Sequence, residues 1–324
     1  MSDSKNFSGS AEGKRIDHPT GTETVGHEWD GIEELNTPLP RWWLWTFYAT
    51  VVFAIGYCVV YPAWPGANGE PGGTSGWSSR QQLQETMDAR QAELMPVHTA
   101  LATVDIGKLP GQPELMNQAI AGGAAAFKAH CVQCHGAGAA GSKGYPNLND
   151  DDWLWGGDLA TIEKTIIDGI RQPGHDATRF SQMPAFGRDG ILTSAEIEDV
   201  ASFVRVISAQ EADSKAARRG KALFEANCAV CHGPGGKGDR AQGAPNLTDA
   251  IWLYGGDRET IKQTVANSRY GVMPAWGERL DKATIRMLAA YVYSLGGGEA
   301  APVAEPAPLQ ADAASAAGGA NGGG

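Results

Sequence analysis

Residues 131–135 of the chain read Cys131-Val132-Gln133-Cys134-His135, and the same spacing returns at Cys228-Ala229-Val230-Cys231-His232. In a C-x-x-C-H motif the two thiols stand about one helical turn apart, so each can add to a vinyl group of a porphyrin. The histidine that follows can then supply a nitrogen to the iron. The two motifs therefore predict two covalently bound haem c groups, held by Cys131, Cys134, Cys228 and Cys231, with His135 and His232 as iron ligands.

Each motif is followed downstream by a Met-Pro pair, at Met183-Pro184 and Met273-Pro274. A thioether sulfur is a common sixth ligand of haem iron and raises its reduction potential. We expect His135 to pair with Met183 and His232 with Met273, although the sequence does not decide whether each methionine serves the haem of its own repeat. Because both axial positions are then filled, we expect an electron carrier without a catalytic site of its own.

Length and composition limit the possible functions. The 324 residues suffice for about two domains, and the net charge of −11 argues against nucleic acid as a partner. Four of the five cysteines lie in the two motifs, and the fifth, Cys58, lies in an apolar run and is interpreted as a small buried hydrophobic residue. The cellular location must therefore come from topology and haem attachment, because no cysteines remain for a disulfide framework.

An apolar run without charged residues extends over residues 42–61. About 20 such residues span the hydrocarbon core of a bilayer, and the run has tryptophans at one end and tyrosines at the other, as membrane helices do. We predict one transmembrane helix at 42–61. The arm at 1–41 that precedes it is expected to be mostly disordered or loosely structured and to end in an extended collar at 30–40. A buried core helix does not explain the aromatic ends, and the run is too long and too far from the N-terminus for a cleaved signal peptide.

The basic residues around this run predict its orientation. Lys14, Arg15 and Arg41 precede it, whereas the first basic residue after it is Arg80, and this asymmetry favours a cytoplasmic N-terminus. Covalent haem is attached outside the cytoplasmic membrane, so both motifs should be periplasmic. We therefore expect a single-pass protein of a bacterial inner membrane, with its N-terminus in the cytoplasm and its haem domains in the periplasm.

The remaining chain contains an internal repeat. Residues 62–116 are expected to form a periplasmic linker with a helix near 80–100, followed by cytochrome c domains at 117–210 and 214–298 and a disordered Ala/Gly/Pro tail at 299–324. Beyond the two motifs, the repeats share a landmark, Trp153-Leu154-Trp155-Gly156-Gly157-Asp158 and Trp252-Leu253-Tyr254-Gly255-Gly256-Asp257. The predicted fold is mainly α: a single N-terminal transmembrane helix followed by two tandem class I cytochrome c domains.

Several further residues are weaker candidates. Arg171 and Arg269 precede the methionine loops and could pair with haem propionates, and His175 could compete with Met183 for iron, although the second repeat has no counterpart of it. Residues 117–213 carry 7 Lys and Arg against 13 Asp and Glu, whereas residues 214–298 carry 12 against 7. This asymmetry suggests the hypothesis that an acidic first domain attracts basic groups on a donor cytochrome or on its sister domain.

The region before and through the span carries a specific resemblance. Asp30-Gly31-Ile32-Glu33-Glu34-Leu35-Asn36-Thr37-Pro38-Leu39-Pro40-Arg41-Trp42-Trp43, one span and two C-x-x-C-H domains together resemble the di-haem subunit, subunit III, of cbb3-type cytochrome c oxidases. The resemblance covers roughly residues 26–298. By carry-over, it implies that Cys131, Cys134, His135 and Met183 hold one haem, and that Cys228, Cys231, His232 and Met273 hold the other.

The same resemblance implies a place in an oxidase complex. The chain would accept electrons from a donor cytochrome c and pass them to the mono-haem c subunit, and then to the haem–copper catalytic subunit that reduces oxygen and pumps protons. The collar and span would dock on that catalytic subunit within the lipid bilayer. Three other interpretations stay open: a free-standing membrane-anchored di-haem shuttle, a haem enzyme or gas sensor with an open iron position, and a non-haem zinc protein.

Overall fold

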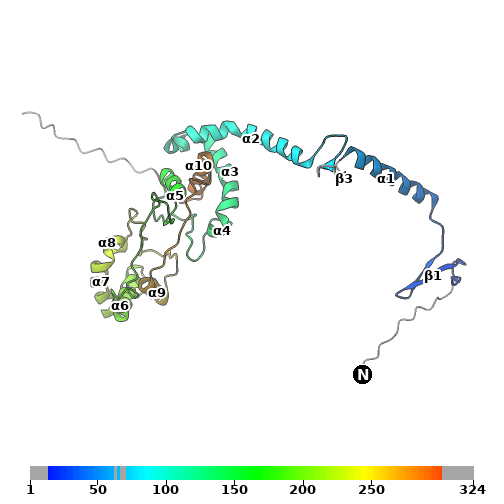
Figure 1. The fold of residues 1–324 in the computed structure, drawn as a ribbon. Coiled ribbons are helices and arrows are strands. Elements are labelled where there is room, and N and C mark those ends of the chain that lie inside the picture. The colour runs from blue at the N-terminus through cyan, green and yellow to red at the C-terminus, as the bar shows by residue number, and fades with distance from the viewer. Residues whose placement is uncertain (1–13, 62–63, 66–70, 301–324) are drawn as a thin grey trace, which may run out of the picture. The chain divides into compact units, whose positions relative to one another are not determined.

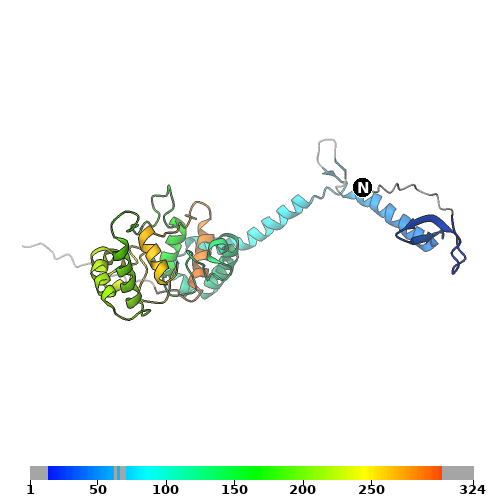
Figure 2. The ribbon, with the colours of Figure 1, turned by 90° about the horizontal axis from the view of Figure 1, so that it is seen from below.

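The computed structural model describes residues 14–61, 64–65 and 71–300. The chain divides into two compact units, and the division falls between Gln91 and Ala92, inside helix α2 (Ser79–Thr103). The first unit carries a β-hairpin and one long helix, and the second carries most of the helices (Figure 1, Figure 2).

The N-terminal arm contains a β-hairpin. Strands β1 (Thr24–Trp29) and β2 (Ile32–Leu35) pair antiparallel, with Asp30 and Gly31 at positive φ in the turn. Asp-Gly is a strong hairpin signal because both central residues of a type I′ turn need positive φ. The prediction of disorder is therefore wrong for β1, whereas β2 lies within the segment predicted to be extended. Residues 1–13 lie outside the described residues.

Helix α1 (Arg41–Val60) is the candidate membrane span, and among the described residues no other helix is both long and apolar enough to cross a bilayer. None of its residues is buried within the protein. Its 20 residues reach about 30 Å at 1.5 Å per residue, which matches the thickness of the hydrocarbon core. The helix begins and ends one residue before the predicted run at 42–61. Beyond it, β3 (Trp64–Pro65) pairs antiparallel with β4 (Pro71–Gly72).

The second unit is helical, as the sequence predicts. Asp158 and Asp257, which end the two landmark motifs, start their helices by accepting hydrogen bonds from the N–H groups of Thr161 (3.0 Å) and Thr260 (2.9 Å). Such caps satisfy backbone donors that the helix itself cannot pair. The elements that follow α2 are η1 (Ile106–Gly111), α3 (Pro113–His130), α4 (Val132–His135), α5 (Leu159–Asp168), α6 (Ser194–Ile207), α7 (Lys215–Asn227), α8 (Ala229–His232), η2 (Pro234–Gly236), α9 (Arg258–Asn267) and α10 (Lys282–Tyr293).

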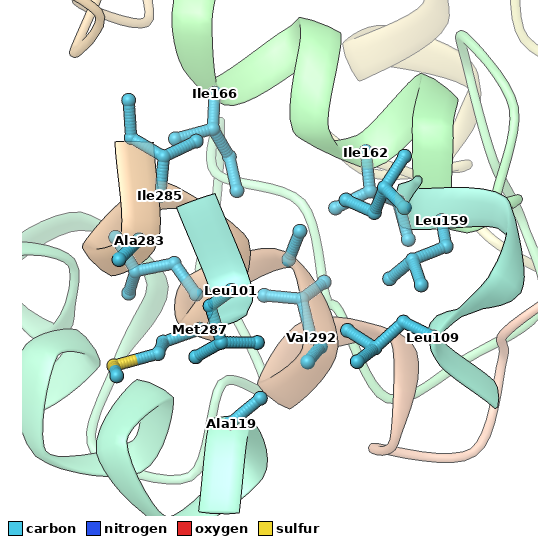
Figure 3. Close-up of a cluster of buried hydrophobic side chains, with 14 of the residues drawn as sticks. Leu101, Leu109, Ala119, Leu159, Ile162, Ile166, Ala283, Ile285, Met287 and Val292 are labelled. Carbon is cyan, nitrogen blue, oxygen red and sulfur yellow. The ribbon is translucent and has the colours of Figure 1, made fainter. Parts of the chain in front are cut away.

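The first hydrophobic core is closed by the last helix of the chain. Buried side chains of α10 pack with those of α3 and α5, and Figure 3 shows Ile285 of α10 beside Ile166 of α5. The end of α2 and η1 add further side chains to the same cluster. Helices α3 and α10 lie so close together that a Cβ on Gly123 would collide with the backbone of Met287.

A buried arginine fastens α10 in this position. Arg286 is 6 % exposed, and its guanidinium donates to the carbonyl oxygens of Leu101 (2.5 Å) and Val104 (2.6 Å) and to the carboxylate of Glu163 (2.8 Å). A buried charge is tolerated only when it is paired and hydrogen-bonded. The contacts of Arg286 therefore join α10 to α2 and α5 at once.

The second core is built in the same way from α6, α7 and α9. Val200 and Phe203 of α6 pack with Phe224 of α7 and with the apolar face of α9. Gly220 of α7 repeats the close approach, because a Cβ there would collide with the backbone of Asp199 on α6. The carboxylate of Asp199 also accepts two hydrogen bonds from Arg219, which lies next to Gly220 on α7.

The two cores therefore cut across the two repeats. Helix α10 belongs to the second repeat but packs around the first motif, and α6 belongs to the first repeat but packs around the second motif. The boundaries 117–210 and 214–298 thus describe a sequence repeat, while each core draws on both. We call the assemblies the first half (α3, α4, α5 and α10) and the second half (α6, α7, α8 and α9), which lie at opposite ends of the second unit (Figure 1, Figure 2).

The halves interlock through the loop that follows each C-x-x-C-H motif. In the first loop, the Gly144 N–H donates to the carbonyl oxygen of Leu253 (2.9 Å), and the ring of Tyr254 lies against Gly144. In the second loop, the ring of Trp155 lies against Gly243 so closely that no Cβ would fit there. Trp155 and Tyr254 occupy the same place in the two landmark motifs, so the two contacts repeat each other.

Glu299 ties the end of the described chain to this interlock. Its N–H donates to the Gly157 carbonyl oxygen (2.9 Å), and its carboxylate accepts hydrogen bonds from the Gly157 N–H (2.8 Å) and from Arg240 (2.7 and 2.5 Å). The predicted tail at 299–324 therefore begins too early by at least this residue. Residues 301–324 of that tail lie outside the described residues.

The exchange of helices also removes the charge asymmetry of the repeats. Residues 117–170 and 269–298, which belong to the first half, carry 7 Lys and Arg against 8 Asp and Glu, and residues 171–268 carry 12 against 12. The folded halves are therefore almost neutral, and the hypothesis of an acidic first domain loses its basis.

Substituting Gly123 tests the close contact between α3 and α10. Gly123→Ala should destabilise the protein by about 1–3 kcal/mol, because the new methyl group forces the two helices apart. Gly138→Ala is the matched control, since it adds the same methyl group where no other atom lies within 4 Å. Denaturant unfolding of both variants measures the difference, and equal stabilities would show that α3 and α10 are not in this contact.

Asp152 should make stability depend on pH. Burial, followed by repulsion from Asp249 and Asp150, raises its pKa to about 6, above its ordinary value of about 4. The folded state then binds more protons than the unfolded state between these values, so stability falls as pH rises through this window. Asp152→Asn should therefore be more stable than the parent protein near neutral pH and lose that advantage at about pH 4. Denaturant unfolding across this range measures the effect, with the exposed Asp176→Asn as the control.

Candidate haem-binding sites

Both C-x-x-C-H motifs adopt the same local structure. Cys131 caps the end of helix α3, and His135 is the last residue of the short helix α4 that follows. The His135 N–H donates to the Cys131 carbonyl oxygen (2.9 Å). The second motif repeats this geometry between Cys228 and His232, at the same distance of 2.9 Å. Each motif therefore presents two sulfurs and one imidazole from a single compact turn.

The two histidines have the protonation state that an iron ligand needs. Nδ1 of His135 lies 3.2 Å from the carbonyl oxygen of Pro146, and Nδ1 of His232 lies 3.1 Å from that of Pro245. A carbonyl oxygen only accepts, so Nδ1 carries the proton and Nε2 keeps its lone pair. Burial lowers the pKa of both imidazoles, although these hydrogen bonds oppose the shift. Both rings are thus neutral and oriented, and this arrangement fits an iron at Nε2.

The cysteines of the motifs are free thiols. Burial, followed by the charge of the neighbouring motif cysteine, raises the pKa of Cys131 to about 11, and the pKa of Cys228 to about 11 in the same way. Both therefore carry protons near neutral pH, and thioether formation consumes neutral S–H groups without leaving a buried charge. No group of three or more His, Cys, Asp or Glu side chains suited to a metal ion occurs in the described part of the chain, so nothing there supports a zinc site.

Met273 lies with the first motif. Its N–H and carbonyl oxygen both bond to Ile170, just after α5, at 3.0 and 2.9 Å. The loop continues along α5, with the Trp276 N–H donating to the Ile166 carbonyl oxygen (3.0 Å). The Met273 side chain is partly buried against the first core, as is Cys131.

Met183 lies with the second motif. Its carbonyl oxygen accepts a hydrogen bond from the Ser268 hydroxyl, and the Phe186 N–H donates to the Val265 carbonyl oxygen of α9 (3.1 Å). The Met183 side chain packs against the second core, which contains Cys228. Core packing thus groups each methionine with the motif of the other repeat, opposite to the expected pairs His135 with Met183 and His232 with Met273.

The weaker candidates take different places. Nε2 of His175 lies 3.5 Å from the Asp168 carboxylate, at the end of α5 in the first half. Met183 packs in the second half, so the two residues lie in different halves. Nε and Nη1 of Arg171 donate to the carbonyl oxygens of Gly271 (2.7 Å) and Ser181 (2.9 Å), so this side chain links the two crossing segments.

Sequence reasoning missed Arg179, whose guanidinium lies over the Trp155 ring. A signal was present, because Arg179 and Arg269 each stand four residues before a ligand candidate, in Arg179-Phe180-Ser181-Gln182-Met183-Pro184 and Arg269-Tyr270-Gly271-Val272-Met273-Pro274. The two repeats also differ in spacing: His135 and Met183 are 48 positions apart, whereas His232 and Met273 are 41 positions apart. The additional residues lie on the chain that crosses between the halves.

Comparison with known proteins shows the family to which the chain belongs. The model of the N-terminal domain of cytochrome oxidase-cbb3, FixP, matches residues 21–68, and that of cytochrome c oxidase, cbb3-type, subunit III, matches residues 118–204 and 215–292. The chain is 51 % identical over 281 residues to the cbb3-type cytochrome c oxidase subunit CcoP of Cereibacter sphaeroides, covering 87 % of this chain and 97 % of that protein. It is 52 % identical over 285 residues to the subunit FixP of Azorhizobium caulinodans, covering 88 % and 96 %. A candidate membrane helix, two C-x-x-C-H turns and these matches together place the chain in the subunit III family of cbb3-type cytochrome c oxidases.

Proposed function

We propose that this chain is the di-haem subunit of a cbb3-type oxidase that accepts electrons from a donor cytochrome c. The observation that carries the proposal is the pair of half-buried, neutral imidazoles, each in one turn with two cysteine thiols and with Nε2 free of a proton. Covalently bound haem c supplies reversible one-electron chemistry when it is present. The chain's part is to hold each group by two thioethers and an oriented histidine.

The packing supports a specific set of iron ligands. We assign Cys131, Cys134, His135 and Met273 to one haem, and Cys228, Cys231, His232 and Met183 to the other, because each set shares a hydrophobic core. A haem iron that took one nitrogen and one sulfur from each of these sets would keep no open position for oxygen or peroxide. This supports a relay function and argues against a haem enzyme or a gas sensor.

The membrane anchor supports a fixed place for the relay. Helix α1 would hold the chain in the inner membrane, with its N-terminus in the cytoplasm and residues beyond 62 in the periplasm. From there the chain would pass electrons to the mono-haem c subunit and then to the haem–copper catalytic subunit. A free-standing shuttle is not favoured, since the similar proteins are named as oxidase subunits and the match at residues 21–68 includes the span.

Purification through a tag on this chain tests the assignment to an oxidase. The solubilised complex should contain copper and haem b in addition to covalent haem c, because the catalytic subunit travels with its partner. Metal analysis and the reduced-minus-oxidised spectrum provide the measurement. A preparation with haem c but neither copper nor haem b would support the shuttle instead.

The proposed ligand exchange is tested in chains that keep a single haem. With Cys131→Ala and Cys134→Ala removing the first attachment site, Met183→Leu should abolish the long-wavelength absorption band of methionine-ligated ferric haem, whereas Met273→Leu should leave it intact. Removing Cys228 and Cys231 instead should reverse the two results. If Met273→Leu abolishes the band of the haem attached at Cys228 and Cys231, each methionine serves its own repeat and the exchange is refuted.

A further inference from the structure

Two arginines have buried donors that nothing in the described protein satisfies. In that part of the chain, the buried side-chain nitrogens without a hydrogen-bond partner are Nε2 of His175, Nε of Arg179 and Nη1 of Arg269. Buried donors are nearly always paired, and an unpaired group on a cation is the most costly kind. The two guanidiniums therefore call for an acceptor, preferably an anionic one.

Arg179 and Arg269 occupy equivalent places. The guanidinium of Arg179 lies 5.3 Å from the centre of the Trp155 ring, and that of Arg269 lies 5.6 Å from the centre of the Tyr254 ring. The two rings hold the same position in the repeated landmark motif, and each arginine stands four residues before its Met-Pro pair. Arg171, which the sequence also suggested, differs from both: none of its nitrogens is among the buried donors without a partner, and two of them donate to backbone carbonyl oxygens.

Both guanidiniums lie where the halves interlock. The Trp155 ring contacts Gly243, and the Tyr254 ring contacts Gly144, and each glycine lies in the loop that follows the motif of the opposite half. Each arginine is also tied to one half: Nη2 of Arg179 reaches the Thr161 carbonyl oxygen of α5 (3.5 Å), and Nη2 of Arg269 donates to Gln263 of α9 (2.5 Å).

The protein's own carboxylates do not fill the free positions. Asp158 and Asp168 act on Arg179 only through charge, and burial lowers the pKa of this arginine in spite of them. Asp158 is occupied in capping α5, and Asp168 bonds to Lys164 (2.6 Å). An anion brought by another molecule is therefore needed, and each porphyrin carries two carboxylate side chains.

We propose that Arg179 and Arg269 bind the carboxylate side chains of the two porphyrins at the junction of the halves, Arg179 for the group attached at Cys131 and Cys134, and Arg269 for the group attached at Cys228 and Cys231. The inference rests on the proposed function. A planar guanidinium matches a carboxylate with two parallel hydrogen bonds, and its backing by an aromatic ring fixes its plane. The arginines act as positioning residues that place a fixed positive charge beside each haem.

Potentiometric titration of the full-length, haem-loaded chain tests this role. Arg179→Gln and Arg269→Gln should each lower one of the two midpoint potentials, because a nearby positive charge favours the reduced iron. Arg179→Lys and Arg269→Lys keep the charge and should restore most of the potential. Arg188→Gln is the matched control: its guanidinium is exposed and contacts Asp189 at 3.2 Å, so both potentials should stay unchanged.

The possible results distinguish an error in the role of the arginines from an error in the proposed function. Unchanged potentials in both Gln variants at full haem content, or equal shifts in the Lys and Gln variants, would overturn the role of the arginines. If a Gln variant loses its haem, redox-induced infrared difference spectra of the Lys variants test the proposal instead. The carboxylate bands should move when Arg is replaced by Lys, and unmoved bands would overturn the proposal. A parent chain without covalent haem would instead contradict the proposed function.

Discussion

The structure depends on two close helix pairs, α3 with α10 and α6 with α7. Helix α10 can close the first core only because Gly123 lets it approach α3, and α6 closes the second core at Gly220 in the same way. In each case the helix that completes a core comes from the other repeat. Neither repeat can therefore bury its apolar helix faces alone, and the two halves must form together. The pairing of α3 with α10 also joins segments far apart in sequence, which slows folding relative to local contacts.

This constraint changes how the surface charge is interpreted. Counted along the chain, the repeats differ strongly in sign, which would suggest an acidic and a basic domain. Counted in space, both halves are close to neutral, because each acquires a segment of the other repeat. Long-range attraction of a basic partner to one half then has no net-charge basis, and any electrostatic attraction would have to come from local groups. Charge counts along a sequence are informative about surfaces only when the fold does not exchange its parts.

The sequence predicted those features that local chemistry determines. The long apolar helix and the mainly α fold follow from local sequence patterns, and the structure confirms both. The exchange of α6 and α10 could not be derived, because the two repeats have the same apolar pattern and either pairing buries equivalent faces. The hairpin at Asp30-Gly31 was predictable but overlooked, since its turn signal lay within a strongly polar segment.

With the proposed ligands, the exchange has a consequence for electron transfer. Each axial pair would join a histidine from one repeat to a methionine from the other, so the two sites could not move apart without breaking a ligand bond. The loop contacts at Gly144 and Gly243 and the bonds of Glu299 to Gly157 and Arg240 restrain the same junction. A site held by rigid elements keeps its geometry better than one on a free loop. Two haems held in this way would exchange electrons at a constant separation, whereas two independent domains on a linker would need to meet before each transfer.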